Sequence, residues 1–84
     1  MQDVIFVCMQ EIEVIFGSVI RFFREKQGYS QEAFADKAGI HRTYVSSIEL
    51  GKVQVSIAIA ERLADALDMP LSKIWKEIER KRPS

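Results

Sequence analysis

A chain of 84 residues in which 48% are apolar and 29% charged is large enough for one small domain with its own core. With one cysteine, Cys8, and one histidine, His41, it cannot form an internal disulfide, and a zinc site is not expected. Basic and acidic residues balance at 12 each, so charge permits a nucleic-acid partner without indicating one.

The chain shows no membrane or secretion signal. The longest apolar run, residues 4–9, is far shorter than the roughly 18 residues of a membrane span. It follows Asp3 and no basic residue, which is unlike a secretory signal. A cytoplasmic protein without metal, cofactor or membrane partner is therefore expected.

Residues 1–15 form an apolar arm whose conformation the sequence leaves open. Ile5, Cys8 and Ile12 recur at a helical spacing, but the run 4–8 is rich in β-branched residues and also suits an extended chain. An ordered apolar arm has to be buried. It either extends the core of its own domain or crosses to a second subunit.

The arm is followed by a predicted helix over residues 16–27, which Gly28 ends. Arg21, Arg24 and Glu25 are expected on the side of this helix that faces away from the core. Its apolar stripe consists of Phe16, Val19, Ile20 and Phe23.

Two shorter helices are predicted next. Ser30 is expected to cap one that ends at Gly39, and the other runs from about His41 to Leu50, where Gly51 closes it.

Ser56 is expected to cap a fourth helix that runs to about Leu67, and a fifth follows Pro70. The apolar stripes of these two helices consist of Ile57, Ala60, Leu63, Ala64 and Leu67, and of Leu71, Ile74, Trp75 and Ile78. The chain is thus predicted to be all-α, with an arm (1–15), a domain (16–79) and a basic tail (80–84).

Residues 30–49, SQEAFADKAGIHRTYVSSIE, predict two short helices that meet at a glycine. Ala35 has to be small because the next helix crosses close over it, and Gly39 supplies the positive φ of the turn. A plain helical hairpin also wants a glycine turn, but it does not explain the polar face of the second helix. A polar face held outward in this way can read the major groove of DNA. This face carries Arg42, Thr43, Ser46 and Ser47.

Residues 16–75 resemble the DNA-binding domain of the Cro/CI-type (XRE) helix-turn-helix family, and GIHRTYVSSIE is most similar to the controller proteins of restriction–modification systems. The resemblance implies a compact five-helix lambda-repressor-like domain without enzyme activity. It implies a transcriptional regulator that binds double-stranded DNA as a homodimer on an inverted-repeat operator, with no small-molecule ligand. The alternative is an antitoxin or another protein-interaction module with secondary DNA binding.

The resemblance also implies roles for individual residues. Arg42 would bond O6 and N7 of a guanine, and Gln31, Lys52 and Gln54 would contact phosphates. The alternative for Tyr44 is a core or rim aromatic, and the alternative for Ser46 and Ser47 is a solvated face. The implied DNA-contacting residues are Gln31, His41, Arg42, Thr43, Tyr44, Ser46, Ser47, Lys52 and Gln54.

The chain departs from the family pattern after the third helix. Leu50 and Val53 stand where charged residues are common, and with Val55 they become candidates for burial, with the arm as the candidate partner. His41 stands at the cap of the third helix, where neutral imidazole can accept a hydrogen bond and protonated imidazole opposes the helix dipole. A pH-sensitive affinity is the resulting hypothesis, which equal operator affinity at pH 6 and pH 8 would exclude.

The predicted dimer surface comprises the end of the fourth helix and the fifth helix. The alternative is that Trp75 and Ile78 cover the chain's own core. The candidate interface residues are Ile59, Ala66, Met69, Leu71, Ile74, Trp75 and Ile78.

Overall fold

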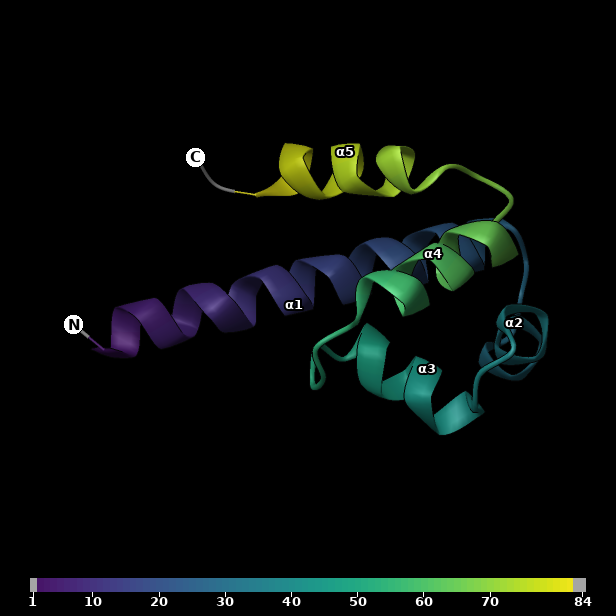
Figure 1. Cartoon of the computed structure of the whole chain (residues 1–84), viewed down its shortest axis with the longest axis horizontal. Helices are drawn as coiled ribbons and strands as arrows, with labels where there is room; N and C mark the ends of the chain where they lie inside the picture. Colours follow the sequence, from purple (N-terminus) through teal and green to yellow (C-terminus); the bar gives the residue numbers. More distant parts are fainter. Residues whose placement is uncertain (1, 83–84) are drawn as a thin grey trace.

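The computed structural model describes the backbone of residues 2–82 and the side chains of residues 12–82. These residues form five α-helices: α1 (Gln2–Lys26), α2 (Gln31–Ala38), α3 (Arg42–Glu49), α4 (Ile57–Ala66) and α5 (Leu71–Lys81). The predicted all-α class is confirmed. In Figure 1, α2, α3 and α4 gather around the carboxyl-terminal half of α1, and α5 runs along its other side. Within the described part of the chain, no helix has the length and apolar character of a membrane span.

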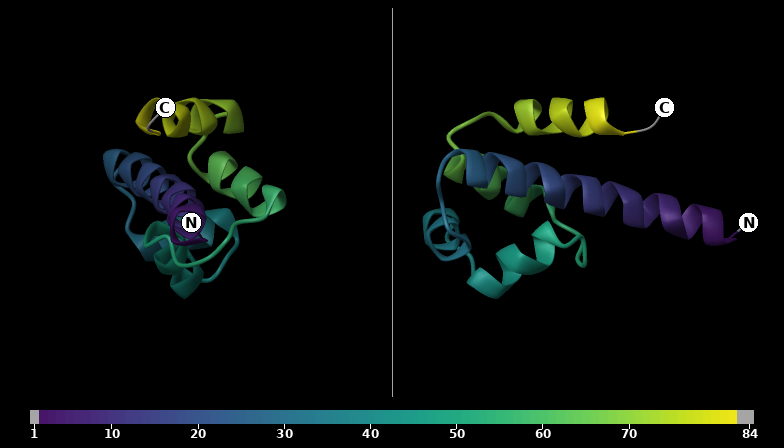
Figure 2. Two further views of the ribbon diagram at one scale, coloured as in Figure 1. Left: turned by 90° about the vertical axis from the view of Figure 1, so that its left-hand side faces the viewer. Right: turned by 180° about the vertical axis from the view of Figure 1, so that it is seen from behind.

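The first helix is longer than the sequence pattern indicated. α1 has 25 residues and begins at Gln2, so the described part of the arm is helical rather than extended. Its amino-terminal half projects beyond α3 and α4, as Figures 1 and 2 show, and gives the molecule a longest dimension of 41 Å. α1 runs across the predicted boundary at residue 15, and α5 runs across the one at residue 79. Residues 1, 83 and 84 lie outside the described residues.

The core lies between the carboxyl-terminal half of α1 and the other four helices. Most predicted stripe residues are buried in it, but Ile57 is 83% exposed because it is the first residue of α4, at the edge of the domain. Trp75 is also half exposed, at 47%. The largest fully buried side chains are Val19, Ile20, Phe34, Val45, Ile48, Leu63, Leu67, Ile74 and Ile78.

Helices α1 to α4 all end in the same way. The residue after the helix, or the next one, adopts positive φ, and the following amide bonds back to a carbonyl five residues earlier, at 3.0–3.1 Å. These tight turns keep the connections short and place each helix against the next. The positive-φ residues are Gly28, Gly39, Gly51 and Asp68.

Helix α1 crosses the carboxyl-terminal end of α3 with almost no space between the two backbones. A Cβ atom added to Gly17 would overlap the carbonyl oxygen of Ile48 and lie 2.8 Å from that of Glu49. Gly51, which follows α3, lies equally close to α1. A Cβ atom added to Gly51 would lie 2.8 Å from Cα of Val14, three residues before Gly17. Gly17 has an ordinary helical conformation, so its role is not a special φ. Its missing side chain leaves the space that the backbone of α3 occupies.

A buried ion pair joins the same two helices. Nε of Arg24 donates to Oε2 of Glu49 at 2.6 Å, and Nη2 donates to Oε1 at 3.1 Å. The third guanidinium nitrogen, Nη1, donates to the carbonyl oxygen of Tyr29 at 2.6 Å. The two side chains are only 9% and 3% exposed. The hydrogen bond to Glu49 raises the pKa of Arg24, so the guanidinium keeps its charge despite burial.

The predicted outward position of Arg24 is therefore wrong. The residue as a whole is 7% exposed, because the side of α1 that carries it faces α3. A charged residue outside the apolar stripe of a helix is normally predicted to lie at the surface. The partner that allows Arg24 to be buried, Glu49, lies 25 positions away in the chain, so the local pattern could not indicate it.

Gly17→Ala is expected to lower the free energy of unfolding by about 3 kcal/mol, because the new methyl group meets backbone atoms that cannot rotate away. Urea unfolding followed by circular dichroism measures this. Ser18→Ala, at the exposed neighbouring position, is the control and should change stability by less than about 0.5 kcal/mol. Equal stability of the two variants would contradict the close crossing.

Arg24→Met is expected to cost about 3–5 kcal/mol of stability, because it leaves the Glu49 carboxylate buried without its counter-charge. The double variant Arg24→Met/Glu49→Leu should recover most of this loss, since no buried charge remains. Denaturant unfolding of both variants is the measurement. A double variant no more stable than Arg24→Met would show that the ion pair is not the cause.

Candidate nucleic-acid interface

Helices α2 and α3 meet at the predicted glycine turn. Oγ of Ser30 accepts a hydrogen bond from the amide of Ala33 at 3.0 Å and caps α2. Gly39 ends α2 with a φ of 74°, and Ala35 is buried at 2% exposure. The predicted cap at Ser30 and the positive φ of Gly39 are confirmed. Arg62 of α4, which the sequence analysis did not single out, donates to the carbonyl oxygen of Gly39 at 3.3 Å and ties the turn to α4.

Helix α3 has one buried and one outward side. Val45 and Ile48 are each 1% exposed and fix the helix to the core. Arg42 and Thr43 are exposed, and Ser46 and Ser47 are half-buried on the polar side. The structure thus brings these four predicted residues together on one face. That face is free of acidic side chains, because the one acid in α3, Glu49, is buried against Arg24.

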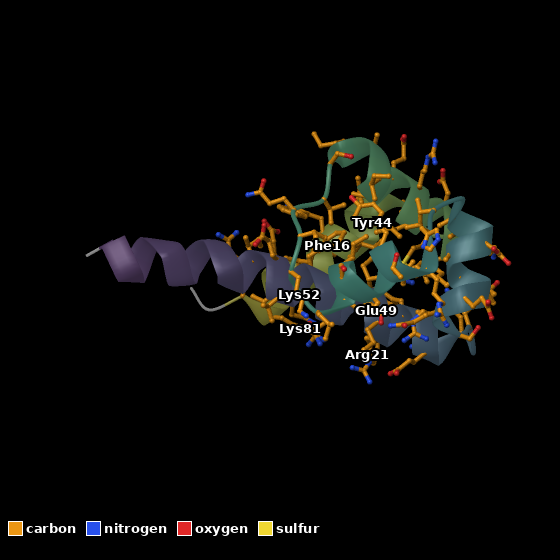
Figure 3. The ribbon with its side chains drawn as sticks, turned by 90° about the horizontal axis from the view of Figure 1, so that it is seen from below. Phe16, Arg21, Tyr44, Glu49, Lys52 and Lys81 are labelled. Carbon is orange, nitrogen blue, oxygen red and sulfur yellow. The ribbon has the colours of Figure 1, made fainter. Side chains whose placement is uncertain are left out.

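Tyr44 lies at the border of this face. It is half-buried and packs against the core cluster, and Figure 3 shows it on the side of α3 toward α4, with Glu49 toward α1. Its ring therefore has a structural role that needs no ligand. A DNA contact through its hydroxyl stays a prediction.

His41 caps the amino-terminal end of α3, as expected. Its Nδ1 accepts a hydrogen bond from the amide of Thr43 at 3.3 Å and lies 2.9 Å from Oγ1 of the same residue. This arrangement requires the tautomer with its proton on Nε2. Since His41 is exposed and adjacent to Arg42, the cap also places its ring at the edge of the candidate interface.

Gln31 is turned toward the protein interior. Its Nε2 donates to Oε1 of Glu49 at 3.0 Å, so Gln31 joins the network of Arg24 and Glu49 and links α2 to α1 and α3. This network was not predicted from the sequence. The sequence signal that could have indicated the network is Glu49 itself. It is a charged residue next to the buried Ile48, and a charge that is buried needs a partner. Phosphate binding by Gln31 stays a prediction.

Lys52 and Gln54 are exposed just beyond α3, and Figure 3 shows Lys52 beside α1. The apolar residues between and around them differ in burial. Leu50 is 57% exposed, so its predicted burial is wrong, because it follows the last turn of α3 on the outer side. Val53 and Val55 are half-buried against the core.

The predicted dimer surface needs a correction. Ala66, Ile74 and Ile78 are 3%, 0% and 0% exposed, because they pack between α4, α5 and α1 inside the single chain. They are core residues and offer no surface to a second copy. Trp75 is exposed, and the residues that remain half-buried are Ile59, Met69 and Leu71.

Comparison with known proteins agrees with this arrangement. The control protein C.MunI of Mycoplasma sp is 40% identical over 73 residues, which are 86% of this chain and 99% of that protein. The control protein C.SmaI of Serratia marcescens is 32% identical over 68 residues, 81% of each chain.

A solved structure shows the same fold. The restriction-modification controller protein C.AhdI from Aeromonas hydrophila is 38% identical and superposes with a TM-score of 0.71 over 73% of this chain and 92% of that one. The Helix-turn-helix family model HTH_3 matches residues 20–74, from the middle of α1 into α5. The chain therefore belongs to the HTH_3 helix-turn-helix family.

Proposed function

We propose that this protein is a sequence-specific DNA-binding transcriptional regulator of the restriction–modification controller type. The observation that carries the proposal is the outward face of α3, on which Arg42 and Thr43 are exposed while Val45 and Ile48 hold the helix to the core. An eight-residue helix held in this way can enter the major groove with its first turn at the base edges.

Arg42 is the residue best placed to read a base. It is the first residue of α3, exposed, and next to the capped helix terminus, whose partial positive charge favours nearby phosphates. The guanidinium fork can donate to O6 and N7 of one guanine together. Thr43 offers a hydroxyl and a methyl group in the same turn. Ser46 and Ser47 follow one turn later along the groove.

Charge supports this function through its arrangement rather than its amount. The net charge is zero, yet Arg24 neutralises Glu49, so α3 presents only Arg42 as a charged group outward. Lys52 adds one positive charge beyond the helix. Phosphate contacts are thus few, and the affinity should depend only moderately on salt concentration.

A homodimer is the second part of the proposal. One short helix reads only part of a site, and two-fold dimers of such domains read two half-sites about 34 Å apart. C.MunI and C.SmaI align with this chain over most of their own length, which supports a regulator of about this size. Occupancy of an operator near a promoter would then control transcription. The proposal includes a cytoplasmic location and no catalytic role.

Arg42→Ala should weaken binding to an operator selected from random DNA by about 1–3 kcal/mol and relax the preference at one base pair of each half-site. Fluorescence anisotropy on the operator and on its single-base variants measures both effects. Lys26→Ala, which removes one positive charge beside Phe22, is the charge-matched control. If Arg42→Ala and Lys26→Ala bind equally well and with unchanged preference, α3 is not the reading helix.

A further inference from the structure

Leu50 is an exposed apolar residue at the end of the candidate DNA-reading helix. Its side chain is 57% exposed, whereas Val45 and Ile48, the buried apolar residues of α3, are each 1% exposed. Among residues 12–82, the other large apolar side chains that are exposed belong to α1, α4 and α5. Packing inside the chain therefore does not explain a leucine at this position.

Leu50 continues the outward stripe of α3. It follows Thr43 by seven residues, Ser46 by four and Ser47 by three, which is the spacing of residues that share one side of a helix. Its amide still donates to the carbonyl oxygen of Ser46 at 3.1 Å, and its φ and ψ, −86° and −3°, stay right-handed. Because the Cα–Cβ bonds of a helix tilt toward its amino-terminal end, the side chain of Leu50 starts in the direction of the two serines.

The backbone at Leu50 has little freedom to move. The amide of Gly51 donates to the carbonyl oxygen of Ile48 at 3.0 Å and closes the helix. Gly51 also lies against α1, where an added Cβ atom would be 2.8 Å from Cα of Val14. The crossing of α1 and α3 that orients the reading face thus also fixes the position of Leu50, as a specific contact with a ligand requires.

The chemistry of leucine limits what Leu50 can contact on DNA. Its side chain cannot form a hydrogen bond with a phosphate or with a base edge. The apolar group that the major groove presents is the methyl group on C5 of thymine, and 5-methylcytosine carries the same group at the same place. Leu50 lies about 10 Å beyond Thr43 along α3, which corresponds to roughly three base pairs when the helix lies along the groove.

We propose that Leu50 is a specificity-determining residue that packs against the C5-methyl group of a pyrimidine in the operator. The contact removes two apolar surfaces from water, which is the source of its free energy. It lies at the opposite end of α3 from Arg42 and so extends the stretch of base pairs that one helix reads. The inference rests on the proposed function, because it requires α3 to lie in the major groove.

The first test removes the methyl group from the DNA. In the operator selected from random DNA, each thymine is replaced singly by deoxyuridine, and fluorescence anisotropy gives the dissociation constants. For the wild type, one position in each half-site should lose about fourfold in affinity, the effect of one buried methyl-sized group. Leu50→Ala should bind the unmodified operator about fourfold or more weakly and should lose nothing further at that position, because the contact is already absent.

A second arm of the test replaces each cytosine singly by 5-methylcytosine. A gain in wild-type affinity at one cytosine that Leu50→Ala does not show would assign the contact to methylated cytosine, whereas the loss at one thymine assigns it to thymine. If neither replacement distinguishes the wild type from Leu50→Ala at any position, the proposal is overturned.

Phe22→Ala is the matched control, because it also truncates an exposed apolar side chain. Phe22 is 47% exposed on α1, and its ring lies beside Lys81 of α5. This variant should respond to deoxyuridine and 5-methylcytosine as the wild type does, and circular dichroism checks that both variants keep the helical domain. A methyl effect that disappears in Phe22→Ala as well as in Leu50→Ala would overturn a direct contact by Leu50.

The proposed function and the role of Leu50 can be told apart by these variants. If Arg42→Ala relaxes the preference at one base pair while Leu50→Ala leaves every methyl effect unchanged, the proposed function stands and the assignment of Leu50 falls. If neither variant changes the preference at any base pair, α3 is not the reading helix and both proposals fall.

Discussion

The buried ion pair between Arg24 and Glu49 is the contact on which the rest of the molecule depends. It joins α1, which carries much of the core, to α3, which carries the candidate DNA-reading face, and Gln31 extends it to α2. Both charged groups are largely shielded from water, so a rotation of α3 that separated them would leave buried charge unpaired at a cost of several kcal/mol. Among the side chains of residues 12–82, no buried polar atom lacks a hydrogen-bond partner. The orientation of α3 is therefore fixed by the interior of the protein, and its outer face is left to the ligand.

This arrangement suits a helix as short as α3. Eight residues do not form a stable helix alone in water, so α3 depends on its cap at His41, on Val45 and Ile48, and on the close crossing at Gly17. The same long helix, α1, provides both that crossing and the projecting arm. The carboxyl-terminal half of α1 thus positions the DNA-reading element.

Much of the fold could be predicted from local signals, because capping serines, glycines and prolines act over a few residues. The turn at Gly39 and the outward polar face of α3 followed from such signals. Arg24 could not be assigned correctly, since a charge on an amphipathic helix is normally solvated and its partner is distant in sequence. Gly17 carries no turn signal, because its role is to leave space for another helix. In α5 the apolar stripe alone could not separate buried Ile74 and Ile78 from exposed Trp75.

The proposed function requires the ion-paired scaffold to present the outer face of α3 to the base edges of DNA. Amide nuclear magnetic resonance spectra of the protein with and without its selected operator test this most directly. The largest shifts are expected on residues 41–47, at the amino-terminal end of α2 and near Lys52, with α5 little changed. Spectra in which α3 is unperturbed while another helix responds to DNA would contradict it.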